Sequence, residues 1–445
     1  MAAAVAQGIT RETVEALSAR LGEPEWLRSR RREAWETFES VPWPDASQEA
    51  WKRVDLKLLN LDAYRPWVPA GTGGPEAMPA RLRPSLAETA GGLVIQRNSE
   101  GVYSRLSDDL RHAGVLFTSL DEAVRRWPER VEAHLGRAVA PVMGKFEALQ
   151  GALWSGGAFL YVPRDVDVAV PLVTSTWMDA MNGAIFPRVL IVVEQGGAVT
   201  LIDEQASLTE ESEAFVSPVV EGVVGDGARV SYTSIQHWGG HAREVGTRRF
   251  LVGRDARLDW VTVTLGARLS RMRLQASFEG AGSESRLRGL YFPGDNQELH
   301  LDTLQDHRAP HTLSDLFFKG ALRDAARAVY YGVIRVHPEA QRTNGYQQNR
   351  NLLLSDRAKA DSVPILEIEA NDVRCSHGAT VGQVDPEQLF YLMARGLPRP
   401  EAEQILVEGF FRQILDAVPD AALRERVAAL VAEKAAGEDN TCLTS

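Results

Sequence analysis

Short apolar segments separated by glycine-rich turns fill the middle of the chain, from about residue 150 to residue 380. Turn signals such as Gly196-Gly197 and Gly225-Asp226-Gly227 lie between them, and helical periodicity is almost absent. The segments with strand character are 158–163, 188–195, 198–204, 228–236, 257–265, 285–292 and 328–336, and the remaining turn signals are 253–255, 280–282 and 294–296. Many strands with few helices are typical of a sandwich, a barrel or a β-solenoid. The spacing is too irregular for a fixed-period repeat, so the pattern does not choose among these three folds.

Residues 1–150 have a different pattern and are predicted to form an N-terminal helical region. Thr10 is a suitable N-cap for a helix that continues to Leu21 and ends at Gly22. A second helix is expected over 24–41, before Pro42. Further short helices are expected over 108–126 and 128–138, and the Gly- and Pro-rich stretch 68–84 is expected to be a loop.

Helical patterns return after the strand-rich zone, which we place at 151–383. Asp385 followed by Pro386 is a typical helix start, and Gly396 with Pro398 ends that helix. A second helix begins at Pro400 and carries an apolar stripe, and a third is expected over 422–434. Residues 384–445 are therefore predicted to be a C-terminal helical domain with a polar tail, which either docks a partner or covers an open end of the β structure.

Composition narrows the class of protein. The chain has 445 residues, a formal net charge of -11 and no long Lys/Arg run, so a nucleic-acid partner is not expected. Its two cysteines, Cys375 and Cys442, do not form a disulfide framework. No signal peptide and no apolar stretch of about 20 residues are visible, which favours a cytoplasmic protein without a membrane-spanning helix.

The segment RCSHGATVG (374–382) places Cys375 two residues before His377. The preceding EIEANDV is predicted to be a strand, and because strand side chains alternate, the thiol and the imidazole would share one face. Both groups are ligands for soft or borderline metals. A lone Cys-x-His pair is nevertheless more commonly a buried thiol beside a hydrogen-bonded histidine.

A second group of titratable residues precedes it. His300, Asp302, His307 and His311 have the spacing of a metal cluster or an acid–base pair, but Pro310 interrupts the run. We interpret them as hydrogen-bonded structural residues. Lys319 is expected at a turn of the β structure or at an interface. No GxxxxGK[ST] phosphate loop is present, so any ATP hydrolysis would come from a partner.

Residues 300–411 also carry an ordered set of motifs. These are Lys319-Gly320, NLLLS at 351–355, Pro364 followed by LEI at 366–368, CSHGAT at 375–380 and LFYLMARG at 389–396. In this order the chain resembles the SufB/SufD family of iron–sulfur cluster assembly proteins. The resemblance implies a right-handed parallel β-helix core between an N-terminal helical region and a C-terminal helical domain, and it thereby selects the solenoid.

Within that family the chain is similar to the SufD branch. SufB scaffolds carry a cysteine six residues before the proline that matches Pro364, where this chain has Ala358. They also carry a ligand glutamate where this chain has Gly378. The resemblance implies that His377 faces the SufB ligands across a heterodimer interface, with Cys375 as an auxiliary thiolate, and that the nascent cluster forms between the two subunits. Imidazole is a good ligand for iron.

The resemblance also implies partners. A SufB-like subunit would pair through the β-helix, with a homodimer as another possibility, and a SufC-like ATPase would dock on the C-terminal helices with Phe410, Phe411 and Ile414 as contacts. The chain would then be a non-catalytic assembly subunit in the SUF complex. It would hold no cofactor tightly and would share only transient iron or a cluster with its partner; the sequence does not show whether a flavin binds to the complex.

Two other functions stay open at this point. One is a SufB-like scaffold that binds the nascent cluster itself, against which the missing cysteine argues. The other is a β-helix enzyme acting on carbohydrate, for which Asp302, Asp306 and Asp315 would have to form an acidic site.

Overall fold

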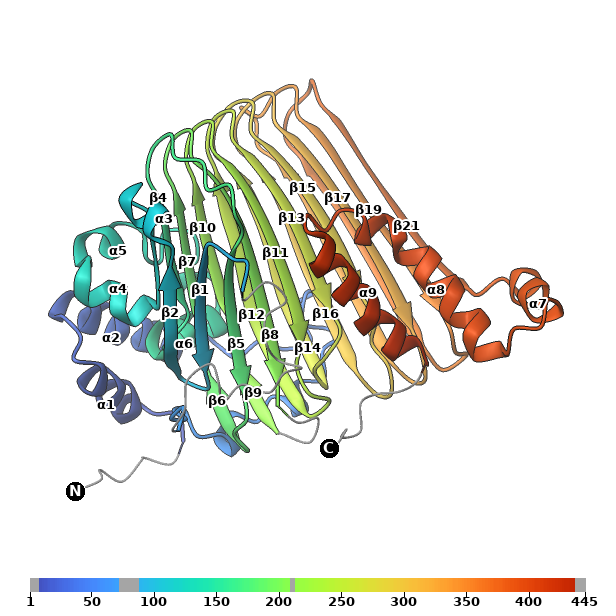
Figure 1. Ribbon diagram of the computed structural model, residues 1–445, viewed down its shortest axis with the longest axis horizontal. Coiled ribbons are helices and arrows are strands. Elements are labelled where there is room, and N and C mark those ends of the chain that lie inside the picture. The colour runs from blue at the N-terminus through green and yellow to red at the C-terminus, as the bar shows by residue number, and fades with distance from the viewer. Residues whose placement is uncertain (1–7, 72–87, 209–212, 437–445) are drawn as a thin grey trace.

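The computed structural model describes residues 8–71, 88–208 and 213–436. Most of the loop predicted over 68–84, and Cys442, lie outside these ranges. The described chain forms a β-solenoid flanked by helices at both ends (Figure 1). The predicted parallel β-helix is therefore confirmed.

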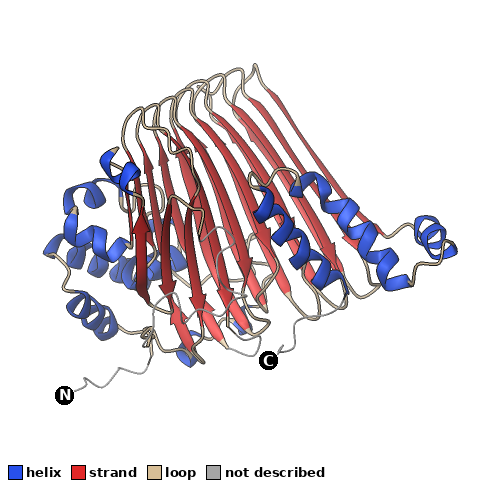
Figure 2. Ribbon diagram, in the orientation of Figure 1, coloured by secondary structure: helices blue, strands red, loops and turns tan. Residues whose placement is uncertain are grey.

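Two large sheets face each other and form the solenoid, and successive strands of the later coils alternate between them (Figure 2). Pairing within each sheet is parallel, except where β1 meets β2 and β3 meets β4. The ten-stranded sheet contains, in spatial order, β2 (Glu100–Leu106), β1 (Gly92–Arg97), β5 (Leu172–Met178), β8 (Ala198–Ser207), β11 (Arg229–His237), β13 (Arg257–Thr264), β15 (Glu284–Tyr291), β17 (Leu313–Leu322), β19 (Asn344–Leu353) and β21 (Arg374–Gln383).

The eleven-stranded sheet forms the opposite wall. It contains β20 (Lys359–Ile368), β18 (Arg327–Val336), β16 (Glu298–His307), β14 (Leu269–Phe278), β12 (Ala242–Val252), β10 (Val219–Val224), β7 (Arg188–Val193), β4 (Ala158–Val162) and β3 (Leu116–Thr118), with β6 (Gly183–Ile185) and β9 (Ala214–Val216) beside them. At one end of the solenoid, β20 and β21 are therefore the last strands of the two sheets.

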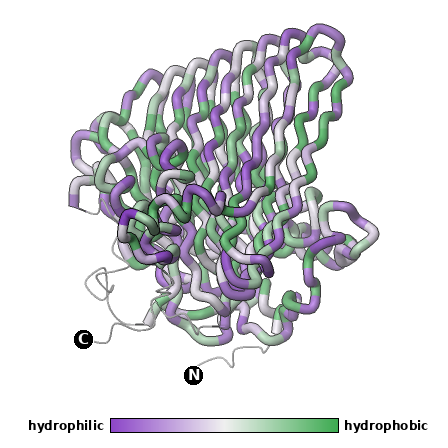
Figure 3. Tube along the Cα trace, turned by 90° about the vertical axis from the view of Figure 1, so that its right-hand side faces the viewer, coloured by the Kyte–Doolittle hydropathy of each residue, from purple (hydrophilic) through white to green (hydrophobic). Residues whose placement is uncertain are grey.

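The alternation of side chains explains how the largest hydrophobic cores form on both faces of these sheets, and Figure 3 shows mixed hydropathy along the strands. Inward residues such as Leu258 and Trp260 fill the space between the sheets. Outward residues Val261 and Val263 of the same strand pack under the C-terminal helices. A third core joins the N-terminal helices to the outer face of the eleven-stranded sheet.

The predicted turns carry the left-handed backbone that a sharp change of direction requires. Gly196 and Gly227 have φ of 70° and 66°, and both lie in turns identified from the sequence. Asp255 and Asp295 adopt the same region in later turns, with φ of 54° and 47°. Aspartate tolerates this conformation better than most residues, which is why the chain can use it there.

The N-terminal region contains strands as well as helices, and the helical prediction over 108–126 was wrong at 116–118, where a strand separates two short helices. The helix predicted over 128–138 ends at His134. Its helical elements are α1 (Arg11–Leu21), α2 (Glu25–Ser40), η1 (Leu56–Leu58), η2 (Leu61–Ala63), α3 (Asp108–His112), α4 (Leu120–Arg126), α5 (Pro128–His134), η5 (Pro141–Met143) and α6 (Lys145–Leu153). Between them, β1, β2 and β3 already begin the two sheets. The first helix has the predicted cap, since Thr10 precedes it and Gly22 ends it with φ of 62°.

The C-terminal helices fold back over the ten-stranded sheet. They are α7 (Pro386–Ala394), α8 (Arg399–Leu415) and α9 (Ala421–Ala436). Helices α8 and α9 lie on the outer face of that sheet, whereas α7 extends beyond β21 (Figure 1). None of the helices in the described ranges is long and apolar enough to cross a membrane.

Candidate functional site at the last coil

The Cys-x-His pair lies on β21, but the strand predicted before it was wrong in its bounds. Strand β20 ends at Ile368, a turn follows, and β21 begins only at Arg374. The alternation of acidic and apolar residues at the start of EIEANDV resembles a strand pattern, but Asn371 and Asp372 belong to the turn. Cys375 and His377 nonetheless share one face, because they are two residues apart on the same strand.

The register of β21 shows which face that is. Cys375 and His377 pair with Gly345 and Gln347 of β19, both buried. Cys375 also packs against Ile334 in the apolar cluster at this end of the solenoid. The pair therefore faces the space between the two sheets, on the last coil.

The two side chains differ in exposure. Cys375 is half-buried, and burial raises the pKa of its thiol, although the backbone N–H of Gly345 acts in the opposite direction. His377 is exposed, because in the described chain no further strand stacks on β21. The imidazole is thus available to a group arriving at the open end of the solenoid.

The two positions that depart from the scaffold pattern lie apart. Gly378 is next to His377, and a Cβ there would contact only Gln348, at 3.7 Å. Ala358 is buried just before β20. Near Ala358, the side chain of Gln383 at the end of β21 donates a hydrogen bond to Asp356 at 3.1 Å. Gln383 is six residues from His377 along the same strand. Six residues of strand span roughly 20 Å, so positions 358 and 377 of one chain cannot ligate the same small cluster.

The histidines and aspartate near residue 300 do not converge. His300 and Asp302 point outward from β16, where His300 contacts Glu298 at 2.6 Å and Asp302 accepts from Arg271 at 3.3 Å. His307 points inward and is stacked on Phe278, with ring centroids 4.3 Å apart.

Each nitrogen of the His307 ring has a hydroxyl partner, at Thr312 (2.7 Å) and at Ser314 (2.8 Å). Burial lowers the pKa of His307 to about 3, so the ring is neutral. His311 lies in a turn with φ of 59°. These contacts agree with the structural interpretation of the group.

The three aspartates of the carbohydrate-enzyme hypothesis are also separated. Asp302 and Asp306 lie on the outer face of the eleven-stranded sheet and pair with Arg271 and Arg308. Asp315 lies in the other sheet and pairs with Arg288. They form no common acidic site.

Comparison with known protein families decides the identity of this architecture. Residues 176–410 match the SUF system FeS cluster assembly, SufBD core domain, and residues 18–173 match the SufBD protein N-terminal region. The chain belongs to the SufBD family.

Relatives of similar length support the assignment. The Bacillus subtilis (strain 168) iron–sulfur cluster assembly protein SufB is 27% identical over 425 residues, which cover 93% of this chain and 90% of that protein. An iron–sulfur cluster assembly SufBD family protein of Staphylococcus haemolyticus (strain JCSC1435) is 28% identical over 433 residues, with the same coverage. The chain is therefore a SufBD-family protein of SUF iron–sulfur cluster assembly, and these relatives do not separate the SufB from the SufD branch.

The apolar stripe of α8 faces this chain's own sheet. Phe411 and Ile414 are fully buried in the core beneath α8 and α9, so a partner could touch them only if α8 left the sheet. Phe410 is half-buried, and its backbone oxygen accepts a hydrogen bond from Lys319 Nζ at 2.7 Å. Lys319 therefore holds the C-terminal helices onto the solenoid.

Other residues of the C-terminal helices are exposed and apolar, and the sequence reasoning did not select them. They are Phe390, Tyr391, Met393 and Ile405, with Phe390 72% exposed. Tyr391 and Ile405 line a shallow groove between α7 and α8. The signal was present in LFYLMAR, because a helix that is apolar on most sides cannot bury all of them against one surface.

Within the described residues, no three His, Cys, Asp or Glu side chains form a group that could hold a metal ion. A metal bound at His377 would therefore need further ligands from outside these residues. The open end of the solenoid is where such ligands can approach.

Proposed function

We propose that this SufBD-family chain acts as the SufD-like subunit of a SUF scaffold complex. It pairs with a SufB-like subunit through the last coil of the solenoid, binds a SufC-like ATPase through its C-terminal helices, and supports iron acquisition and cluster formation at the interface. The observation that carries the proposal is the exposed, inward-facing His377 on the terminal strand β21.

The separation of positions 358 and 377 supports a site shared between two chains. A scaffold cysteine at the first position and a histidine at the second lie at opposite ends of the coil within one chain, roughly 20 Å apart along the strand. Between two chains that meet at their open ends, ligands from different positions can come together. The outer edges of β20 and β21, which pair with no further strand of the described chain, offer the backbone groups for that meeting.

The C-terminal helices supply the proposed ATPase contact. Phe390, Tyr391, Met393 and Ile405 are the side chains available there, in place of the buried Phe411 and Ile414. The chain itself performs no turnover in this proposal; iron or a cluster passes through the site as cargo, and ATP hydrolysis belongs to the partner.

The test is co-expression with SufB-like and SufC-like partners, followed by mass measurement of the intact complex. His377→Ala is compared with Ser376→Ala, an exposed neighbour on the opposite face of β21. We expect both variants to assemble and only His377→Ala to lose cluster maturation, by at least about tenfold. If His377→Ala matures clusters at the wild-type rate, the assignment of the site is wrong. If the chain does not bind the SufB-like subunit, the whole proposal is wrong.

The second candidate is a SufB-like scaffold that binds the cluster alone, for which the similarity to Bacillus subtilis SufB is the supporting observation. Anaerobic reconstitution of this chain with iron and sulfide distinguishes the two. A stable chromophore that depends on Cys375 favours the scaffold, and its absence favours the shared site.

A further inference from the structure

A groove of about 540 Å³ lies on the outer face of the eleven-stranded sheet, beside the end of α5. It follows the ends of β7, β10, β12 and β14 and the turns after them. Four arginines and three carboxylates line it, namely Arg137, Arg249, Arg254, Arg308, Glu194, Asp226 and Glu279. None of these residues belongs to the site at the last coil or to the C-terminal helices.

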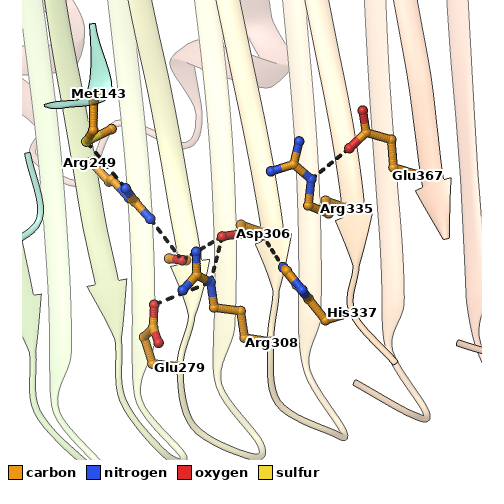
Figure 4. A network of polar contacts seen from close by, with 9 residues as sticks. Met143, Arg249, Glu279, Asp306, Arg308, Arg335, His337 and Glu367 are labelled. Carbon is orange, nitrogen blue, oxygen red and sulfur yellow. Dashed lines mark hydrogen bonds and ion pairs between the residues drawn. The ribbon is translucent and has the colours of Figure 1, made fainter. Parts of the chain in front are cut away.

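Arg249 is a half-buried cation of the groove, and Figure 4 shows its surroundings. Among the described residues, its guanidinium donates two long hydrogen bonds, to Met143 Sδ and to Ser277 Oγ, each at 3.5 Å, and its Nε is buried without a hydrogen-bond partner. In the described chain no carboxylate oxygen lies within ion-pair distance of this guanidinium, which is costly for a half-buried charge.

The nearest carboxylate beyond Ser277 is already used. Asp306 accepts from Arg308 Nε at 2.8 Å and from Ser277 Oγ at 3.0 Å, and its other oxygen contacts His337 Nε2 at 3.0 Å (Figure 4). Burial lowers the pKa of Arg249, and the charge of Asp306 opposes this shift, but the oxygens of Asp306 are bonded to other groups rather than to the Arg249 guanidinium.

The carboxylate on the neighbouring strand β10 also has other partners. Glu221 lies opposite Arg249 in the register of β10 and β12. It is fully buried and accepts from Arg188 Nε at 2.9 Å and from the backbone N–H groups of Gly136 and Val139. Arg249 thus lies between two carboxylates whose partners are other cations.

The wall formed by the end of α5 and the segment after it adds two more donors. Arg137 is exposed and has no ion pair or side-chain hydrogen bond in the described structure. His134 also lines the groove, and its Nδ1 is buried without a hydrogen-bond partner in the part of the chain that the structure describes. Burial and the charge of Arg137 lower the pKa of His134, so the ring is neutral and keeps one N–H to donate.

The carboxylates of the groove do not satisfy these donors. Asp226 pairs with Arg254 at 3.0 Å, and Glu279 lies 3.8 Å from Arg308. Glu194 accepts from the hydroxyl of Tyr161. The groove arginines without an anionic partner in the described ranges are therefore Arg137 and Arg249.

An apolar row forms part of the floor. Val192, Val223 and Leu251 are register partners on β7, β10 and β12, and all three line the groove. Two strand spacings make this row about 10 Å wide, which is enough for a flat ring system. The same row continues through Ser277 to Asp306.

We propose that this groove binds a phosphate-bearing small molecule, with Arg137 and Arg249 as the phosphate ligands. Guanidinium groups bind phosphate through parallel N–H···O bonds, and each such charge-assisted bond is stronger than a neutral one. A bound oxyanion would supply the partner that the chain itself does not give to Arg249. The apolar row would contact the remainder of an organic phosphate.

The test uses the purified full-length chain and isothermal titration at low ionic strength. Inorganic pyrophosphate is the first probe and ADP is the second. We expect saturable binding to the wild type that weakens as salt is added. Tighter binding of ADP would show that the apolar row contributes, and equal binding of both probes would restrict the site to the phosphate group.

Two substitutions and a matched control decide the proposal. Arg249→Gln and Arg137→Gln are each expected to weaken binding about tenfold or more. Arg286→Gln removes another exposed arginine without an ion pair, on the opposite sheet, and is expected to change nothing. Because Arg137 is exposed, its variant should fold even if Arg249→Gln does not. Absence of saturable binding of both probes to the wild type, or an equal loss in Arg286→Gln, would overturn the proposal.

Discussion

Cys375 and His377 point in the same direction from β21, yet only the thiol is covered by the preceding coil. A Cβ at Gly345 would come within 3.2 Å of Cys375 Sγ, which shows how closely β19 approaches the thiol. His377 lies opposite Gln347 and remains exposed. Of the two groups, the imidazole is therefore the one that a metal ion held by a partner chain can reach without rearrangement.

The covered thiol should react slowly with alkylating reagents. Burial raises the pKa of Cys375 above its ordinary value, so at pH 8 less thiolate is present than in an unfolded chain. We expect iodoacetamide to label Cys375 more slowly in the native chain than in the denatured chain, measured by peptide mass spectrometry. A Cys442→Ser background removes the other cysteine. Equal labelling rates in both states would contradict the burial of Sγ.

The sequence pattern located strands but did not select the fold, which followed from the family resemblance. Segments such as 257–265 and 328–336 were identified from apolar alternation, and they are β13 and β18. Strands β5 and β16 were missed because they carry polar residues at buried positions, including Thr174 and Asp302. Local alternation cannot show that both faces of a strand are covered, since the covering helices and coils are distant in sequence.

The same limit applies to the candidate sites. The spacing of Phe410 and Ile414 correctly indicates a buried helical face, but it does not say whether the face packs on this chain or on a partner. The groove around Arg249 was not predicted at all. Its residues come from the end of α5, from three strands and from the turns after the strands, and the parallel register brings them together.

The Lys319-Gly320 motif has two separable roles, and the first concerns the lysine. Its Nζ donates to the Phe410 backbone oxygen at 2.7 Å and lies over the Phe410 ring, 4.9 Å from the centroid. We expect Lys319→Met to destabilise the packing of α8 by about 1–3 kcal/mol. Hydrogen exchange of α8 should accelerate, whereas Lys359→Met, at an exposed position of β20, should leave it unchanged.

Gly320 has a steric role inside the solenoid. A Cβ at this position would meet the ring of Tyr291 at 2.0 Å, and Tyr291 is fixed by a hydrogen bond from Asn349 at 2.9 Å. We expect Gly320→Ala to lower the free energy of unfolding by about 1–3 kcal/mol.

The matched control for that change is Gly382→Ala. Nothing lies within 4 Å of a Cβ at Gly382, so little change in the free energy of unfolding is expected there. Denaturant titration of the two variants measures the difference, and equal midpoints would contradict the proposed contact with Tyr291.

His307 should make the stability of the protein depend on pH. Its folded pKa is about 3 and its ordinary value is 6.5, so between these values the unfolded chain binds more protons than the folded chain. Stability should therefore fall as pH decreases from about 6.5 towards 3, by up to about 1.4 kcal/mol per pH unit for this one proton.

Urea unfolding of wild type and His307→Gln between pH 7 and pH 5 isolates this contribution. The variant will be less stable at neutral pH, because Thr312 and Ser314 lose a ring partner, but its stability should decline less steeply with acid. His311→Gln, at a turn position, should keep the wild-type slope, and an unchanged slope in His307→Gln would mean that the buried ring is not the group that titrates.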